Sequence, residues 1–244
     1  MKNLISVLIV IVLFSFFVSC TETVAPVLTG NISGFIDLYE EDNTRINDRS
    51  GVKVFIEGRN NYAYTNKDGR YTIENVEAGI FNIVFAKEGF GLYKIIAREF
   101  VGGGDAYLYS IGLAKLPSFN VTSLNINKVT NQPPYLRISG NLSDARDYSR
   151  NVILFFGKRE DVSNDPQNYL LVNTAYVYRD STSYSDSFLE KEYLIERGFT
   201  SGETVHVAAY SISNGYWGVY DPITGREFYY NVGTSPVKSS FVLD

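Results

Sequence analysis

The sequence predicts an all-β protein that consists of two consecutive antiparallel β-sandwich domains. Short alternating or continuous apolar runs recur from Thr29 onward, separated by Gly, Asn and Asp turns, while helical periodicity is nearly absent. Aromatic residues make up 15% of the chain, with 19 Tyr and 16 Phe, and such residues favour strands. The series of strands breaks at Leu116-Pro117-Ser118 and then restarts, which predicts two modules.

The first residues predict a signal peptide over residues 1–19. A polar start with one positive charge precedes an almost wholly apolar run over residues 4–19. As a helix this run would span about 24 Å, short of a hydrocarbon core of about 30 Å. The pattern therefore favours a secretion signal over a stable transmembrane helix.

Cys20 follows the apolar run and is the only cysteine in the chain. The segment Phe17-Val18-Ser19-Cys20 resembles the lipoprotein box of bacteria. This resemblance implies cleavage before Cys20 and attachment of diacylglycerol to its thiol, which would anchor the protein stably in a membrane. Residues 20–27 would then form a tether, in which Glu22 resembles the surface-export signal of Bacteroidetes lipoproteins. We expect an outer-membrane protein at the cell surface, with the periplasmic face as the alternative orientation. A plain signal peptide followed by a free thiol is the other interpretation.

The first predicted domain covers residues 28–116. Its expected strands are Asn31–Leu38, Val52–Glu57, Tyr62–Thr65, Tyr71–Val76, Gly79–Ala86, Tyr93–Val101 and Ala106–Ala114. The ordered blocks Gly51–Gly58, Tyr64–Ile73, Val76–Ile83 and Lys87–Phe90 resemble the carboxypeptidase regulatory-like domain. The resemblance implies a transthyretin-like sandwich of seven strands, which serves as a non-catalytic stalk or accessory module.

The second predicted domain covers residues 117–244. Its expected strands are Phe119–Val129, Tyr135–Leu142, Asn151–Lys158, Tyr169–Tyr178, Ser185–Ile195, Glu203–Ile212, Glu227–Val232 and Val237–Leu243. The segment Phe199–Gly215 resembles the corner and penultimate strand of a fibronectin type III domain. This implies an immunoglobulin-like sandwich, and the alternative is a two-sheet β-domain of different topology.

The scarcity of reactive side chains argues against catalysis, and we predict neither an enzyme nor a cofactor. The chain has one His, His206, which is expected in the middle of a strand. A zinc site normally gathers several His and Cys ligands, so no metal is predicted. Gly102-Gly103-Gly104 lacks the helix and the Lys-Ser/Thr pair of a phosphate loop and is expected to form a hairpin loop. The net charge of −5 argues against nucleic acid as a partner.

Carboxylates gather in two loop regions, over Asp37–Asp48 and Asp144–Asp165. A pair of them could in principle act as a glycosidase site, and the first loop offers oxygen ligands for calcium without the EF-hand spacing. Solvated loop charge is the interpretation that we prefer for both regions.

The predicted binding surface is aromatic and lies between the last two strands. Tyr216-Trp217-Gly218-Val219-Tyr220 precedes a turn at Asp221–Gly225, and Phe228-Tyr229-Tyr230 follows it. Exposed Tyr and Trp suit sugar rings or protein partners, so Tyr216, Trp217, Tyr220 and Tyr229 are the candidate ligand-binding residues. The alternative is that these rings pack on their own domain or on the first one.

Three functions follow from these features. The first is a non-catalytic surface-binding or adhesion lipoprotein with a glycan or protein ligand. The second is a structural or assembly subunit of an outer-membrane complex for glycan uptake or secretion, and the third is a carboxylate-dependent hydrolase.

Overall fold

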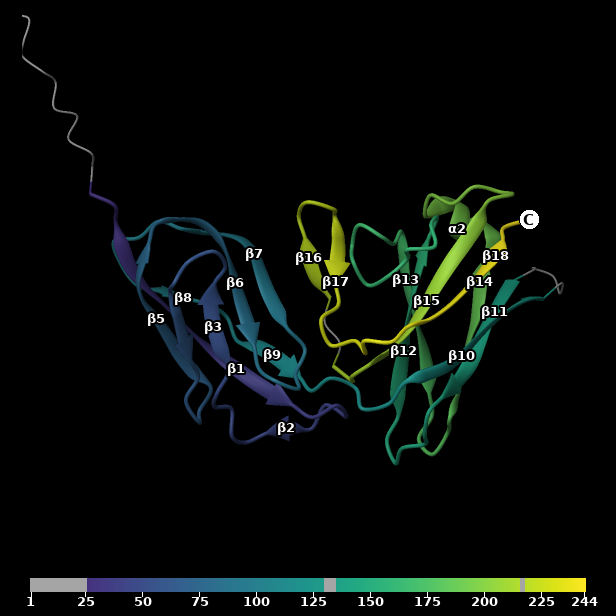
Figure 1. Cartoon of the computed structure of the whole chain (residues 1–244), viewed down its shortest axis with the longest axis horizontal. Helices are drawn as coiled ribbons and strands as arrows, with labels where there is room; N and C mark the ends of the chain where they lie inside the picture. The colour runs from purple at the N-terminus through teal and green to yellow at the C-terminus, as the bar shows by residue number, and fades with distance from the viewer. Residues whose placement is uncertain (1–25, 130–134, 216–217) are drawn as a thin grey trace, which may run out of the picture.

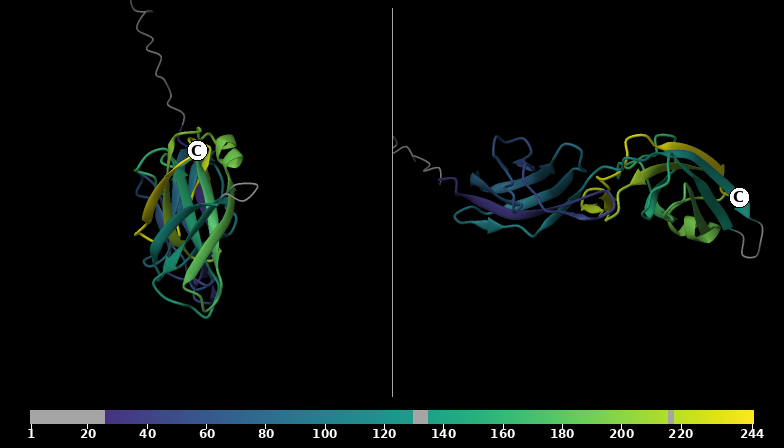
Figure 2. Two further views of the ribbon diagram at one scale, coloured as in Figure 1. Left: turned by 90° about the vertical axis from the view of Figure 1, so that its right-hand side faces the viewer. Right: turned by 90° about the horizontal axis from the view of Figure 1, so that it is seen from below.

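The computed structural model describes residues 26–129, 135–215 and 218–244. Nearly all regular structure in these ranges is β-strand, arranged in two groups of sheets that follow one another along the chain (Figure 1). The two groups lie in a row and give the molecule an elongated shape (Figure 2). The predicted fold class, all-β with antiparallel sandwiches, is confirmed.

The first group contains two facing sheets, with strand orders β2-β1-β5 and β4-β3-β6-β7, and β8 and β9 pair with β1 in parallel. Its strands are β1 (Thr29–Tyr39), β2 (Arg45–Ile46), β3 (Lys53–Ile56), β4 (Tyr62–Tyr64), β5 (Arg70–Glu77), β6 (Gly79–Ala86), β7 (Tyr93–Phe100), β8 (Ala106–Tyr107) and β9 (Ile111–Ala114).

The core of the first group forms because its strands alternate buried and outward residues. On β1, Ile32, Ile36 and Leu38 are at most 1% exposed, and they pack with residues of the opposite sheet such as Val54 and Phe85. Alternation with period two places such residues on one face of a strand, so the sequence pattern translates directly into the core.

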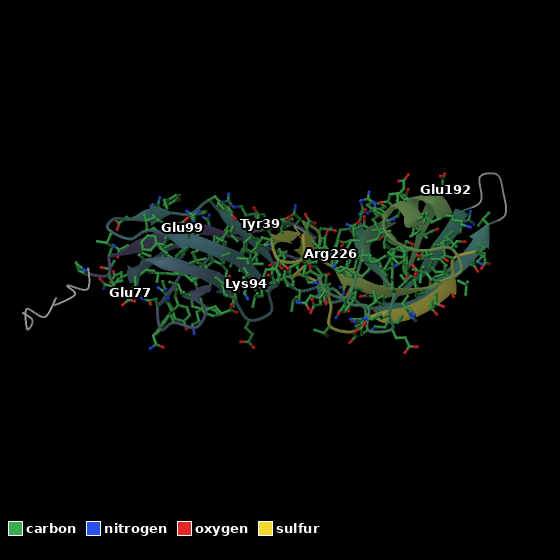
Figure 3. The ribbon with its side chains drawn as sticks, turned by 90° about the horizontal axis from the view of Figure 1, so that it is seen from above. Tyr39, Glu77, Lys94, Glu99, Glu192 and Arg226 are labelled. Atoms are coloured by element: carbon green, nitrogen blue, oxygen red, sulfur yellow. The ribbon has the colours of Figure 1, made fainter. Side chains whose placement is uncertain are left out.

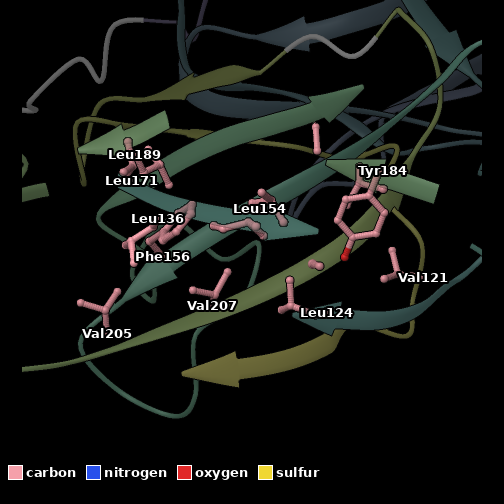
Figure 4. Close-up of a cluster of buried hydrophobic side chains, with 14 of the residues drawn as sticks. Val121, Leu124, Leu136, Leu154, Phe156, Leu171, Tyr184, Leu189, Val205 and Val207 are labelled. Carbon is pink, nitrogen blue, oxygen red and sulfur yellow. The ribbon is translucent and has the colours of Figure 1, made fainter. Parts of the chain in front are cut away.

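The second group contains two sheets with strand orders β10-β11-β14 and β13-β12-β15-β18, and the separate hairpin β16-β17. Its elements are β10 (Val121–Val129), β11 (Tyr135–Leu142), β12 (Arg150–Gly157), β13 (Leu171–Val177), β14 (Ser183–Glu190), α2 (Lys191–Glu196), β15 (Thr204–Ile212), β16 (Val219–Asp221), β17 (Arg226–Phe228) and β18 (Val237–Val242). The core between the sheets is drawn in Figure 4, where Leu136 of β11 faces Leu154 and Phe156 of β12.

Strand β12 is buried on both faces. Leu154 and Phe156 belong to the core between the sheets, whereas Ile153 and Phe155 belong to a second apolar cluster on the outer side of the sheet. The loop over residues 158–170 and the segment after β17 cover that side, since Tyr169 and Tyr229 are part of the second cluster or pack against it. This cover explains the continuous apolar run of β12.

Three predicted strands differ from the structure. Ser185–Ile195 ends as a strand at Glu190, opposite Tyr135 at the start of β11, and the good helix formers that follow build α2, with Leu194 buried. Ala106–Ala114 is interrupted between β8 and β9. Glu227–Val232 is shortened to β17, and Val232 instead forms an isolated bridge with Ile212.

The two groups of sheets meet at a hydrogen-bonded junction. The Glu41 carboxylate accepts from the Ser118 amide at 2.6 Å and from the Tyr148 hydroxyl. The Asn214 amide donates to the Glu41 carbonyl at 2.8 Å, and the Ser213 hydroxyl donates to the Lys115 carbonyl. The burial of Tyr148 and its hydrogen bond to Glu41 raise the pKa of Tyr148. The junction therefore joins the groups through several contacts besides the connecting chain.

Candidate functional site

The structure describes two of the four predicted ligand-binding residues, Tyr220 and Tyr229, and they differ in exposure. Tyr216 and Trp217 lie outside the described residues, and so does the predicted lipidation site Cys20. Tyr220, on β16, is 62% exposed. Tyr229 instead packs its ring against Phe155 at 5.8 Å and donates its hydroxyl to the Glu227 carboxylate at 2.7 Å. Of the two described candidates, only Tyr220 presents a largely free ring.

The other described rings of the hairpin pack at the junction. Phe228 and Tyr230 stack at 5.5 Å, and Tyr230 contacts Tyr93 of β7 at 6.4 Å between ring centroids. Burial raises the pKa of Tyr230 to about 12. Figure 3 shows Tyr39 and Lys94 at the end of the first group that faces Arg226 of the hairpin. This part of the hairpin holds the two groups together.

The remaining predicted features have structural roles. His206 lies within β15, opposite Gly157 and Ser240. The Asp37 carboxylate accepts from Arg45 at 2.5 Å and Arg49 at 3.1 Å, so two guanidinium groups already balance the charge that calcium would require. The loop Gly102–Gly104 connects β7 and β8, which belong to different sheets, so the expected hairpin at this loop is wrong.

A different surface gathers groups suited to ligand binding. We call it the tyrosine groove. It is an open depression of about 560 Å³ beside the end of β13 and the start of β14. Small-molecule sites commonly have volumes of about 300–1,000 Å³. Its lining residues are Asn125, Arg137, Ser139, Gly140, Asn141, Tyr176, Tyr178, Ser181, Ser183, Tyr184 and Ser185.

Two exposed tyrosines form the aromatic side of the tyrosine groove. Tyr176 and Tyr178 are 49% and 73% exposed, while Val177 between them is fully buried. Successive strand residues point to opposite faces, so burial of Val177 in the core forces both rings outward. Their centroids lie 5.0 Å apart at an interplanar angle of 85°. The rings therefore form a corner with one ring face and one ring edge.

Short polar side chains form the other side of the groove. The strand register aligns Asn125 of β10, Ser139 of β11 and Ser185 of β14 in one row across the outer face of the sheet. The next row contains Asn141 and Ser183. These hydroxyl and amide groups both donate and accept hydrogen bonds. The face is therefore suited to a ligand rich in hydroxyl groups.

The floor of the groove is fixed by a buried contact. The Tyr184 hydroxyl donates to the Ser123 carbonyl at 2.8 Å, and its ring lies against Gly140. A Cβ at Gly140 would lie 2.0 Å from the Ser123 carbonyl oxygen and 2.5 Å from the Tyr184 hydroxyl. Burial raises the pKa of Tyr184, so its hydroxyl stays neutral and donates under all ordinary conditions. Only glycine permits this close approach.

The described lining of the groove contains one charged residue, Arg137, and no carboxylate. Arg137 already has an interaction partner within the protein. Across the described ranges, the His, Cys, Asp and Glu residues form no group of three or more that could hold a metal ion. In the same ranges, no helix has the length and apolarity needed to cross a membrane.

The groove was not among the residues that we predicted. The alternation in Tyr176-Val177-Tyr178 was visible as part of the expected strand Tyr169–Tyr178 and indicates that both rings share one face. A single sequence does not show which face of the strand the rest of the protein covers, and this decides the exposure of the rings.

Comparisons with known proteins find similar solved structures but no family for this chain. No family model matches it, and no curated protein matches it. A solved structure from Bacteroides uniformis, whose name proposes carbohydrate binding, is 16% identical, with 86% of this chain and 100% of that chain covered at a TM-score of 0.32. A DUF3823 family protein from Parabacteroides merdae is 11% identical, with 85% and 98% covered at a TM-score of 0.28.

A further similar structure is a cohesin–X-dockerin complex from Acetivibrio cellulolyticus. It is 20% identical, and the match covers 35% of this chain and 58% of that chain at a TM-score of 0.31. The chain thus spans a little over half the length of this neighbour.

Proposed function

We propose that this protein is a non-catalytic binding protein of the bacterial cell envelope and that it binds carbohydrate through the tyrosine groove. The observation that carries the proposal is the exposed pair Tyr176 and Tyr178 beside a face of serine and asparagine side chains. A sugar ring has an apolar C–H face that stacks on aromatic rings, and hydroxyl groups that bond to amides and hydroxyls. Both kinds of partner meet in this groove.

The composition of the groove supports binding without catalysis. Glycosidases use a pair of carboxylates on either side of the bond that they cleave. The described lining residues include neither Asp nor Glu. A hydrolase that acts at this groove therefore has no acid and base among those residues, and we retain binding as the function.

The arrangement of the two groups of sheets supports display of the groove away from a membrane. Strand β1 begins at the end of the first group that is farther from the second group (Figure 1). Its last residue, Tyr39, lines a small cavity at the junction of the two groups. An 11-residue strand is about 36 Å long. With lipid attached at Cys20, the first group would act as a spacer, and β10, β11 and β14 would face outward.

The strand order also bears on the families of the two domains. We propose a carboxypeptidase regulatory-like domain over residues 28–116 and a fibronectin type III-like domain over residues 117–244. The three-stranded and four-stranded sheets of the second group, β10-β11-β14 and β13-β12-β15-β18, support an immunoglobulin-like sandwich there.

The experiment is a glycan array probed with the mature protein and two double variants. Tyr176→Ala with Tyr178→Ala removes the aromatic side of the groove and is expected to abolish binding. Tyr62→Ala with Tyr64→Ala is the matched control, because these exposed rings form a similar perpendicular pair at 5.9 Å on β4 of the first group. The control variant is expected to bind like the unaltered protein.

Two results would contradict the proposal. Binding that survives in the groove variant would place the ligand site elsewhere, with Tyr220 as the next candidate. An array without any binding, together with co-purification of envelope proteins from native membranes, would favour the assembly-subunit hypothesis.

The anchor is tested separately. Cys20→Ala is expected to move the protein from the membrane fraction to the soluble fraction or to leave it unprocessed. If this variant stays in the membrane fraction at normal mass, lipidation at Cys20 is wrong.

A further inference from the structure

We infer that the tyrosine groove takes a single sugar unit of a soluble, uncharged oligosaccharide rather than the surface of an insoluble polysaccharide. This inference rests on the proposed function and specifies the class of ligand for that site. It follows from the relative orientation of the two exposed rings, the shape of the floor and the charge of the lining.

The ring orientation limits the site to one stacking contact. A flat, extended polysaccharide surface is matched by aromatic rings that share one plane. Tyr176 and Tyr178 are nearly perpendicular, at 85°, and their centroids are only 5.0 Å apart. A sugar that lies flat on one ring meets the edge of the other ring. The corner thus holds one sugar unit from two sides and cannot support a row of units.

The concave shape of the groove leads to the same conclusion. Gly140 and Tyr184 line the groove as buried residues between the outward Ser139 and Ser185 of their strands, and the contact of Tyr184 with the Ser123 carbonyl holds them in place. A flexible chain end can enter a depression of this kind.

The charge of the lining selects neutral sugars. Serine and asparagine provide uncharged donors and acceptors, and the one charged lining residue among those described, Arg137, is already engaged by a partner within the protein. The lining is therefore matched mainly to uncharged hydroxyl groups, and an uncharged oligosaccharide requires no cation.

The test measures the affinity of the mature protein for soluble oligosaccharides of increasing length by isothermal titration calorimetry. The probes are the malto-, cello-, xylo-, manno- and chito-oligosaccharide series from two to six units. For the series that binds, the Kd is expected to change by less than about threefold between three and six units, because one unit carries the contact. Pull-down on the insoluble parent polysaccharides is expected to retain little protein.

Variants distinguish stacking from hydrogen bonding by the tyrosine hydroxyls. Tyr176→Phe with Tyr178→Phe keeps both ring faces and is expected to bind within about threefold of the unaltered protein, whereas the double alanine variant is expected to lose at least about tenfold in affinity. Both changes lie on the surface, and an unchanged Tm would confirm that the variants fold.

The outcomes separate this inference from the proposed function. Affinity that rises by about tenfold or more from three to six units, or retention on insoluble polysaccharide alone, would overturn the single-unit site while carbohydrate binding stands. A preference for uronic-acid or sulfated oligosaccharides would overturn the neutral ligand class. The absence of binding to every saccharide would overturn both proposals.

Discussion

Replacement of Glu41 with alanine is expected to uncouple the unfolding of the two groups of sheets. The Glu41 carboxylate accepts hydrogen bonds from the Ser118 amide at 2.6 Å and from the Tyr148 hydroxyl. Truncation removes the acceptor for both donors at once. The backbone contact between Asn214 and the Glu41 carbonyl does not depend on the side chain and should persist.

The size of the effect follows from the nature of the acceptor. A hydrogen bond to a charged group contributes about 1.5–3 kcal/mol to stability, so two such bonds set a range of about 3–6 kcal/mol. Water can reach half-buried Glu41 and Tyr148, which favours the lower end. We expect a loss of about 3 kcal/mol in the free energy of unfolding, or about 6–12 °C in Tm for a chain of this size.

The neighbouring Glu40 provides the control. Its carboxylate pairs with Lys115 at 2.7 Å, but both side chains are more than 40% exposed. An exposed ion pair contributes about 0–1 kcal/mol, so Glu40→Ala removes the same charge from the adjacent position at little cost. The comparison isolates the effect of the junction from the effect of net charge.

The assay is calorimetric and urea-induced unfolding of the three proteins under one condition. The unaltered protein is expected to unfold with the two groups coupled, and Glu41→Ala is expected to show a second transition at lower temperature. Equal losses in the Glu40 and Glu41 variants, or two independent transitions already in the unaltered protein, would refute the account of the junction.

Two further predictions concern the second group of sheets. Gly140→Ala is expected to lower the free energy of unfolding in urea by about 3 kcal/mol, the upper end for overpacking, because its Cβ would lie 2.0 Å from the Ser123 carbonyl oxygen. Gly104→Ala is the control and should change stability little, because the space around Gly104 is open. Equal losses of stability in the two variants would contradict the packing argument. Burial raises the pKa of Tyr169 to about 12. The stability that its neutral hydroxyl provides by donating to the Glu227 carbonyl is therefore complete below about pH 10 and is lost as the pH rises toward about 12. Unfolding measured at several pH values should therefore show a weaker alkaline decline in Tyr169→Phe than in the unaltered protein, and identical declines would contradict this assignment.

The local pattern of residues was sufficient to predict most strands. Alternation along β1 and the continuous apolar run of β12 identify a one-sided and a two-sided buried strand, because side-chain direction has a period of two. Failures occurred where pairing with a distant strand decides the structure. The expected strand Ser185–Ile195 stops at Glu190, opposite Tyr135 at the start of β11, and the residues that follow make their backbone hydrogen bonds within α2 instead.

The prediction of a binding surface failed in part for a related reason. An aromatic-rich segment indicates large apolar rings, but the sequence does not show whether these rings meet solvent or another element. Tyr229 and Tyr230 pack against Phe155 and Tyr93, which lie far away in the chain. Tyr176 and Tyr178 remain exposed.

The sequence alone determined the all-β class, the spacing of the strands and the scarcity of reactive side chains, because these depend on composition and on neighbours within a few residues. Only the tertiary structure decided which rings stay exposed, that the Glu41 carboxylate joins two groups of sheets, and that Gly140 and Tyr184 close the floor of a groove. Each of these depends on contacts between residues far apart in the chain, and local periodicity carries no information about such contacts.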